Sequence, residues 1–173
     1  MKNTIIFDLD GTLAIIEKRR IKAGSPTGKT PTPSKMNWDV FVDADNIKLD
    51  EPNIPVIKMA QTFHKDGFKI VIFSGRNDRS FHTTKEWLNQ HGVPFDLLVM
   101  RPDKFKDESW PIASGNPATK AMRFMPDEIL KKEMLNTFVN KDDVLMCVDD
   151  RQKVVDMWRE NGLTCFQVAP GDF

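Results

Sequence analysis

TIIFDLDGT, residues 4–12, joins a short apolar run to two aspartates and a glycine, an order in which a buried strand ends at a polar turn. Similar apolar runs recur at 68–73, 95–100, 144–148 and 163–168, and segments of helical spacing separate most of them. Near-continuous apolar strands that alternate with helices are typical of a parallel sheet with helices on both faces. The sequence therefore predicts an α/β fold, a three-layer sandwich around a mainly parallel, five-stranded sheet.

Helices are expected between these strands, and two long polar insertions interrupt the pattern. The expected helices lie at about 55–66, 81–91 and 127–138, with a last one around Val154, Val155 and Trp158 before Gly162. The insertions, at about 15–53 and 101–125, contain prolines and glycines that resist regular structure. We therefore expect residues 1–173 to form a single Rossmann-like domain in which the insertions are small, loop-type caps.

Composition excludes several classes of protein. The 173 residues suffice for one substantial core, and 25 basic residues balance 25 acidic ones. Zero net charge excludes the overall basic surface of a protein that coats nucleic acid. No run approaches the roughly 18 apolar residues of a membrane span, and the first residues lack the apolar segment of a secretion signal. We expect a cytoplasmic protein without a membrane partner, with Cys147 and Cys165 buried and unpaired.

One segment of the first insertion is charged with a single sign. Between Glu17 and Asp39 the chain carries no acid and six basic residues, namely Lys18, Arg19, Arg20, Lys22, Lys29 and Lys35. Such a local patch suits binding of one phosphorylated end rather than coating of a strand. Residues 23–30, AGSPTGKT, also satisfy a loose P-loop pattern. Because no strand is expected before them and prolines follow them, we expect no nucleoside-triphosphate site there.

Polar side chains follow four of the predicted strands: Asp8 and Asp10, Ser74 and Arg76, Arg101, and Asp149 and Asp150. Carboxyl ends of parallel strands meet at one edge of a sheet, so we expect these groups to lie together. One acidic pair alone also fits a turn, but two pairs at one edge would repel each other without a cation. Carboxylates without histidine or cysteine suit Mg²⁺, which typically takes one or two of them together with substrate phosphate.

The order of these groups resembles the haloacid dehalogenase superfamily of phosphohydrolases. Residues 5–13, IIFDLDGTL, match its first motif at every position, Thr12 included. The resemblance implies that Asp8 attacks phosphorus and forms an aspartyl-phosphate. Asp10 would protonate the leaving oxygen and then activate the hydrolytic water. Gly11 permits the bend that would bring both carboxylates to one phosphate.

Two further motifs of the superfamily supply groups for the phosphate. Ser74, followed by Gly75, matches the second motif, whose hydroxyl binds the transferring phosphoryl group. Lys131 fits the third motif, a lysine that neutralises negative charge around Asp8 and the phosphate. Alternatively, Lys131 forms a surface salt bridge with Asp127, one helical turn away.

The fourth motif concerns the metal. VDDR, residues 148–151, matches the acidic motif that holds Mg²⁺ in this superfamily. The resemblance implies Mg²⁺ as the cofactor, with Asp8, Asp149 and the backbone carbonyl of Asp10 as ligands. Asp150 would orient a water molecule or share the metal site.

A narrower likeness covers nearly the whole chain and is strongest over residues 148–173. There the sequence is similar to the 3′-phosphatase domains of the bacteriophage polynucleotide kinase-phosphatase family. That family uses two arginines and an acid placed before the motif-three lysine. Arg19 matches the first arginine, with Arg20 as the alternative, Arg76 matches the second, and Asp127 matches the acid. Two arginines can clamp a phosphate dianion with charge-assisted hydrogen bonds.

These resemblances imply a phosphomonoesterase that removes 3′-phosphate from DNA or RNA ends, in a host cytoplasm if the gene is phage-borne. The implied substrate-binding residues are Thr12, Arg19, Gly75, Arg76 and Asp127. The kinase half has no counterpart in these residues, which leaves room for a separate kinase or ligase partner, and the insertion at 103–125 is longer than in that family. A mononucleotidase with 3′- or 5′-nucleotides as substrates, another small-molecule phosphatase, or a non-catalytic phosphate-binding module are the alternatives. Trp38 and Trp110 lie in the insertions and are candidates for base stacking, whereas Trp87 and Trp158 are expected to pack within helices.

Overall fold

Five strands form the central sheet of this computed structural model, which describes residues 1–24, 36–103, 110 and 118–171. The sheet has the order β5-β4-β1-β6-β7, and all four neighbouring pairs are parallel. Its strands are β1 (Thr4–Phe7), β4 (Lys69–Asn77), β5 (Leu97–Arg101), β6 (Val144–Asp149) and β7 (Cys165–Gln167). The predicted five-stranded parallel sheet is therefore confirmed.

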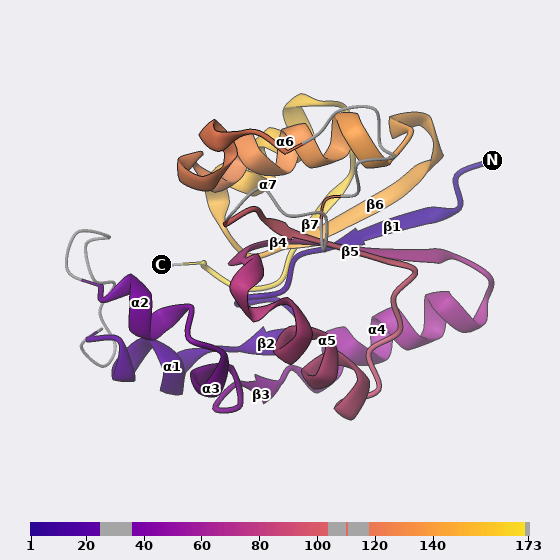
Figure 1. Ribbon diagram of the computed structural model, residues 1–173. Coiled ribbons are helices and arrows are strands. Elements are labelled where there is room, and N and C mark those ends of the chain that lie inside the picture. Colours follow the sequence, from indigo (N-terminus) through magenta and orange to yellow (C-terminus); the bar gives the residue numbers. More distant parts are fainter. Residues whose placement is uncertain (25–35, 104–109, 111–117, 172–173) are drawn as a thin grey trace.

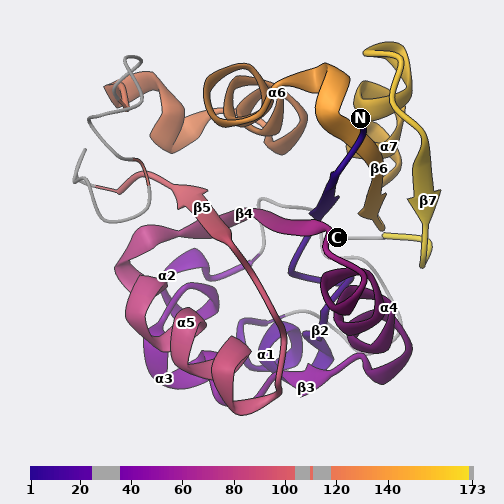
Figure 2. The same cartoon turned by 90° about the vertical axis from the view of Figure 1, so that its right-hand side faces the viewer.

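Helices cover both faces of this sheet and complete the three layers (Figure 1). Helices α6 (Asp127–Phe138) and α7 (Gln152–Glu160) lie on one face, and α4 (Ile54–Lys65) and α5 (Phe81–Gln90) lie on the other. Figure 2 shows the same layers along the strands, with β5 at one edge of the sheet and β7 at the other. The four helices fall close to the positions that the apolar spacing predicts.

The pleat of β1 explains why this sequence forms the centre of the sheet. Successive side chains of a strand point to opposite faces. Ile5 and Phe7 belong to the apolar core under α4 and α5, whereas Ile6 belongs to the core under α6 and α7. All three side chains are at most 1% exposed. Both faces of β1 are thus covered, which a run of consecutive apolar residues requires.

The first insertion contains regular structure, contrary to expectation. It forms β2 (Ala14–Ile15), α1 (Glu17–Lys22), α2 (Trp38–Phe41), α3 (Ala44–Ile47) and β3 (Glu51–Pro52). The side chains of Asn37 and Asp43 accept hydrogen bonds from backbone N–H groups of α2 and α3, so each short helix begins at a good N-cap. These elements lie beside the carboxyl ends of the sheet strands (Figure 1).

The second insertion and two turns add only 3₁₀ structure among the described residues. The 3₁₀ helices are η2 (Asp78–Ser80), η4 (Lys120–Phe124) and η5 (Lys141–Asp143). Residues 25–35, 104–109, 111–117 and 172–173 lie outside the described part, and with them Lys29, Lys35 and most of the P-loop-like segment.

Two other expectations concern the cysteines and the membrane. Cys147 and Cys165 are buried, free thiols in facing positions of β6 and β7, as expected. Within the described ranges, no helix combines the length and the apolar character needed to cross a bilayer.

Candidate active site

Three buried groups meet at the carboxyl ends of the two central strands. Asp8 follows β1, Asp149 ends β6, and Lys131 reaches them from α6. The Lys131 ammonium donates to Asp8 Oδ1 at 2.6 Å and to Asp149 Oδ2 at 2.9 Å. The Lys131 residue is 1% exposed, so it is not the surface salt-bridge residue that the i,i+4 spacing with Asp127 allowed. One cation therefore bridges two carboxylates that come from different strands.

Asp150 completes a compact acidic cluster. Asp8, Asp149 and Asp150 each offer a carboxylate oxygen, and these atoms lie within 4.8 Å of one another. Two buried oxygens, Asp8 Oδ2 and Asp150 Oδ1, have no hydrogen-bond partner among the described residues. Buried carboxylate oxygens without partners are costly unless a cation binds them. The oxygen-only donor set therefore fits a hard divalent cation.

Burial dominates the ionisation of this cluster. Burial, together with the charge of Asp149, raises the pKa of Asp8 to about 7, although Lys131 acts in the opposite direction. Burial and the charges of Asp8 and Asp149 raise the pKa of Asp150 to about 8. Burial opposes the charge on Lys131, but the carboxylates of Asp149 and Asp8 outweigh burial and raise its pKa. Lys131 therefore stays charged, whereas the raised pKa values of Asp8 and Asp150 let these two carboxyl groups keep protons near neutral pH.

Two arginines surround the second aspartate of the first motif. Asp10 Oδ1 accepts hydrogen bonds from Arg19 Nη2 at 2.6 Å and from Arg76 Nε at 2.7 Å. Burial alone would raise the pKa of Asp10, but the two guanidinium charges outweigh burial and lower it. Asp10 is thus held as a carboxylate, turned toward the arginines. Arg20, the alternative to Arg19, forms an ion pair with Glu17 of the same helix at 3.5 Å.

Asp50 joins this network, and sequence reasoning missed it. Its Oδ1 accepts from Arg19 Nε at 2.9 Å and its Oδ2 accepts from Arg76 Nη2 at 2.6 Å. Asp50 is 4% exposed, and its backbone carbonyl accepts from the Trp87 indole. It lies 40 residues from Asp10 in the first insertion, and no motif around it marks it as a site residue. The two arginines therefore bind two carboxylates in this structure, and the clamp on a phosphate dianion stays a prediction.

Ser74 sits on β4, which runs three residues beyond it, rather than after the strand. The pairing with β5 shifts register between Ser74 and Asn77, so the strand is irregular where it borders the site. The Ser74 hydroxyl accepts from the backbone N–H of Arg76 at 3.1 Å. Thr12 is fully buried and its hydroxyl has no partner among the described residues.

A second ion cluster fixes the start of α6 beside the site. Asp127 pairs with Arg101 Nη2 at 2.5 Å and with Arg151, and these charges outweigh burial and lower its pKa. A Cβ on Gly75 would lie 2.6 Å from Asp127 Oδ1, so only glycine allows this close approach. Arg101 also donates to the Gly75 carbonyl at 3.0 Å. This cluster ties β4, β5, α6 and the turn after β6 together.

Comparison with known proteins agrees with this arrangement. A family model of the polynucleotide kinase PNKP phosphatase domain matches residues 2–173. The chain belongs to this family. It is a phosphatase of the haloacid dehalogenase superfamily, of the polynucleotide kinase-phosphatase type.

Solved structures of the superfamily share the fold. A chain of the Pnkp1/Rnl/Hen1 RNA repair complex is 29% identical, with a TM-score of 0.71 over 98% of this chain and 43% of that chain. The present chain therefore spans less than half the length of that relative. A substrate-bound phosphoserine phosphatase complex is 19% identical, with a TM-score of 0.58 over 98% of this chain and 88% of that one. That second likeness shows the fold alone.

Two expectations about this PNKP-type phosphatase domain are wrong. Three residues of the expected basic patch are paired with acids and so do not form an unopposed patch. Lys18 pairs with Glu51, and Arg20 pairs with Glu17. Arg19 pairs with both Asp10 and Asp50. Trp110 is not available for base stacking, because it is 1% exposed and packs edge-on against Phe138. Trp87 and Trp158 are buried in helices, as expected, and Trp38 is 51% exposed.

Proposed function

We propose that this domain is a Mg²⁺-dependent phosphomonoesterase that removes 3′-phosphate from polynucleotide ends through an aspartyl-phosphate on Asp8. The observation that carries this proposal is the buried cluster of Asp8, Asp149 and Asp150 with its unpartnered oxygens, beside the lysine of the third motif. A non-catalytic phosphate-binding module would need neither Asp8 as a nucleophile nor the second carboxylate of Asp10 two residues later. Family membership supports a polynucleotide as the substrate.

The acidic cluster fits a magnesium ion. Asp8, Asp149 and Asp150 would hold it, because they present oxygen donors and no nitrogen or sulfur. When bound, the ion supplies positive charge that stabilises negative charge on the phosphate oxygens. Lys131 adds a positive charge beside Asp8, which reduces the repulsion between the Asp8 carboxylate and an anionic substrate.

The first chemical step forms a bond between a carboxylate oxygen of Asp8 and phosphorus, while the bond from phosphorus to the 3′-oxygen breaks. The leaving oxygen needs a proton, and Asp10 would deliver it. Because Arg19 and Arg76 lower the pKa of Asp10, the protonated form is scarce in the free protein. Proton delivery is therefore the demanding part of this step.

The second step releases phosphate. A water molecule attacks phosphorus, gives up a proton to the Asp10 carboxylate, and the bond to Asp8 breaks so that the nucleophile is restored. Here the lowered pKa of Asp10 is an advantage, because the base is already ionised. Splitting one displacement into two lets the same carboxyl group act as acid and then as base.

The product of this reaction, a 3′-hydroxyl end, is the end that a ligase joins. The relative in the Pnkp1/Rnl/Hen1 RNA repair complex assembles with other proteins. We propose by analogy that a separate kinase or ligase works on the same ends in the cytoplasm that contains this domain, which for a phage gene is the host's.

A comparison of substrates tests the proposed function. We expect kcat/KM for a 3′-phosphorylated oligonucleotide to exceed that for 3′- and 5′-mononucleotides, and phosphate release to need added Mg²⁺. The Asp8→Asn variant should release no phosphate while its melting temperature stays near that of the wild type. Equal or faster turnover of mononucleotides would indicate the mononucleotidase, and undiminished turnover by Asp8→Asn would exclude the aspartyl-phosphate.

A further inference from the structure

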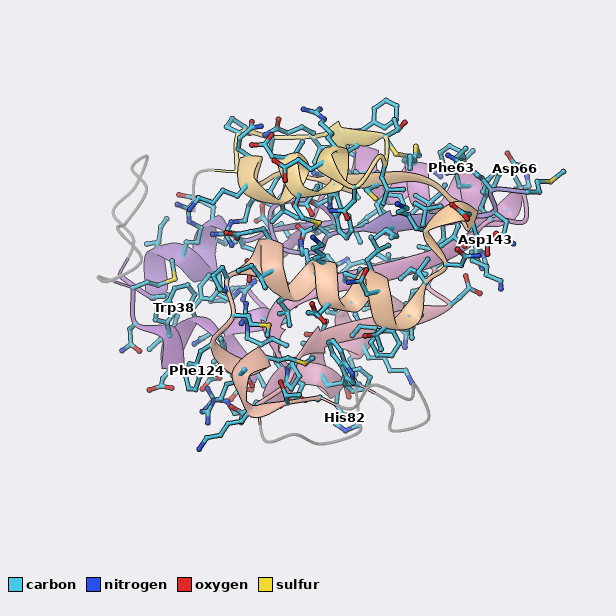
Figure 3. The ribbon with its side chains drawn as sticks, turned by 90° about the horizontal axis from the view of Figure 1, so that it is seen from above. Trp38, Phe63, Asp66, His82, Phe124 and Asp143 are labelled. Atoms are coloured by element: carbon cyan, nitrogen blue, oxygen red, sulfur yellow. The ribbon has the colours of Figure 1, made fainter. Side chains whose placement is uncertain are left out.

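Two large aromatic side chains lie exposed at the same end of the molecule. Trp38 on α2 is 51% exposed and Phe124, the last residue of η4, is 76% exposed. Figure 3 shows both at one end, opposite Phe63, Asp66 and Asp143. Exposed aromatic rings offer flat apolar faces that a planar ligand can cover. The two aromatics come from different insertions, Trp38 from α2 in the first and Phe124 from η4 in the second.

Contacts connect Trp38 to the active site. Its ring packs edge-on against Phe41, with ring centres 5.6 Å apart. The Arg19 guanidinium lies over the Phe41 ring, 4.3 Å from the ring centre. Arg19 in turn binds Asp10 at 2.6 Å. Trp38 is therefore the outermost member of a stack that ends at the proposed proton donor.

Phe124 is connected to the site from the other side. Arg101 donates to the carbonyls on both sides of it, Arg123 at 3.2 Å and Met125 at 2.6 Å. The same guanidinium donates to the Gly75 carbonyl, next to Ser74. The position of Phe124 is thus fixed relative to the phosphate-binding motif, although its ring is exposed.

Two half-exposed arginines lie between these aromatics. The buried Asp103 holds both, Arg79 at 3.6 Å and Arg123 at 3.1 Å. Arg79 also approaches Asp39, the neighbour of Trp38, at 3.6 Å, and the Arg123 guanidinium lies 5.4 Å from the Phe124 ring centre. A continuous rim therefore runs from Trp38 through the arginines to Phe124, and Arg79 follows Arg76 by only three residues.

We propose that Trp38 and Phe124 stack with the unpaired bases that adjoin the phosphorylated end, while Arg79 and Arg123 face its backbone. This inference rests on the proposed function, since it assumes a polynucleotide substrate. Aromatic side chains bind bases of any sequence in this way, because every base has a π-face. Asp103 and Asp39 pair with these two guanidinium groups, but each arginine is almost half exposed and keeps further N–H donors for the phosphodiester charges of the same strand. The rim would thus distinguish a polynucleotide end from a small phosphate ester.

The test measures binding and turnover in matched aromatic variants. In the Asp8→Asn background, Trp38→Ala and Phe124→Ala should each weaken binding of a 3′-phosphorylated single-stranded oligonucleotide by about 10-fold. With the nucleophile present, the ratio of kcat/KM for the oligonucleotide to that for p-nitrophenyl phosphate should fall by about the same factor. The control is Phe166→Ala on β7, a side chain that is 52% exposed at the far edge of the sheet, and it should leave both quantities unchanged.

Conservative variants separate stacking from folding. Because Trp38 packs against Phe41, Trp38→Ala could loosen α2, whereas Trp38→Phe and Phe124→Trp keep a ring at each position and should retain most of the binding. Loss of oligonucleotide binding in these ring-preserving variants, or full binding in the alanine variants, would overturn the stacking role. A wild-type protein that turns over p-nitrophenyl phosphate but binds no oligonucleotide would overturn the polynucleotide substrate and the rim together.

Discussion

At the scale of single residues, the site depends on ion pairs between side chains that are distant in sequence and that the fold brings together. Lys131 bridges Asp8 and Asp149, and Asp50 neutralises the two arginines that hold Asp10. Asp8 and Asp149 could be predicted from the sequence because they lie at strand ends, whereas Lys131 lies on α6 and was predicted from the family resemblance. Asp50 could not, because its role comes from contacts across 31 and 26 residues of chain to Arg19 and Arg76.

The lowered pKa of Asp10 predicts a pH effect that depends on the leaving group. In the proposed mechanism a nucleoside 3′-oxygen would take a proton from Asp10, whereas p-nitrophenolate leaves without one. Protonated Asp10 becomes more abundant as pH falls, so the ratio of the oligonucleotide rate to the p-nitrophenyl phosphate rate should rise from about pH 8 to about pH 6. Ionisation of Asp8 affects both substrates equally and cancels in the ratio.

Single-turnover rates for the two substrates over this range provide the measurement. In Asp10→Asn the oligonucleotide rate should fall by at least about 100-fold, and the remaining ratio should be flat with pH. A ratio that does not change with pH in the wild type would show that Asp10 is not the proton donor.

At the scale of elements, apolar spacing predicted the strands and the long helices, since each buries a continuous face. The short helices α2 and α3 depend on single N-caps, Asn37 and Asp43, within a segment whose composition favours loops. The prediction of an unopposed basic patch was wrong for a related reason. The acidic partners, Glu51 for Lys18 and Asp50 for Arg19, lie 33 and 31 residues away along the chain, and the pairing of β2 with β3 brings Glu51 close to Lys18.

Asp149 ends β6 and Asp150 follows it, so two of the acids proposed to hold Mg²⁺ lie at this strand end, and Gln167 at the end of β7 and Gly171 beyond it contact Asp150. Gln167 donates to the Asp150 carbonyl at 3.0 Å, and a Cβ on Gly171 would lie 2.3 Å from that same oxygen. Gly171→Ala should therefore displace Asp150 and weaken Mg²⁺ binding by about 10-fold. Calorimetric titration of the free protein with Mg²⁺ measures this without any turnover.

Gly162→Ala is the matched control for this prediction. Gly162 and Gly171 both have a positive φ, +78° and +64°, but a Cβ on Gly162 would meet no atom within 4 Å. Each substitution should cost roughly 1–2 kcal/mol of stability from backbone strain. Only Gly171→Ala should change Mg²⁺ affinity, so equal affinities in the two variants would show that the contact with Asp150 does not matter.

At the scale of the whole molecule, zero net charge conceals a concentration of buried charges of both signs at one end of the sheet. The cluster of Asp8, Asp149 and Asp150 lies there, and within the described residues Lys131 forms ion pairs with two of its three carboxylates. The equal numbers of acidic and basic residues excluded a protein that coats nucleic acid, but they did not predict how the charges are arranged at this end of the sheet. The position of the charges depends on strand order, which places β1 between β4 and β6.

The acidic cluster predicts that Mg²⁺ binding is coupled to the release of protons from Asp8 and Asp150. Burial and neighbouring carboxylates raise the pKa of Asp8 to about 7 and that of Asp150 to about 8, both from a usual value of 3.8. A raised carboxyl pKa means that the folded protein keeps protons that the unfolded chain has already released. Without Mg²⁺, these two groups should therefore lower stability as pH rises from about 4 to about 8. Thermal melts of the metal-free protein across this range would show it.

At the proposed site Mg²⁺ would displace these protons, because a metal ion binds ionised carboxylates. Its affinity should therefore rise with pH, by up to about tenfold per pH unit for each proton released, and level off once both groups are ionised above about pH 8. Calorimetry at several pH values, in buffers of different ionisation enthalpy, measures both the affinity and the protons released. Asp150→Asn removes one of the two titrating groups and should make the slope shallower. An affinity that stays constant from about pH 6 to about pH 8 would mean that the ion binds elsewhere than at these carboxylates.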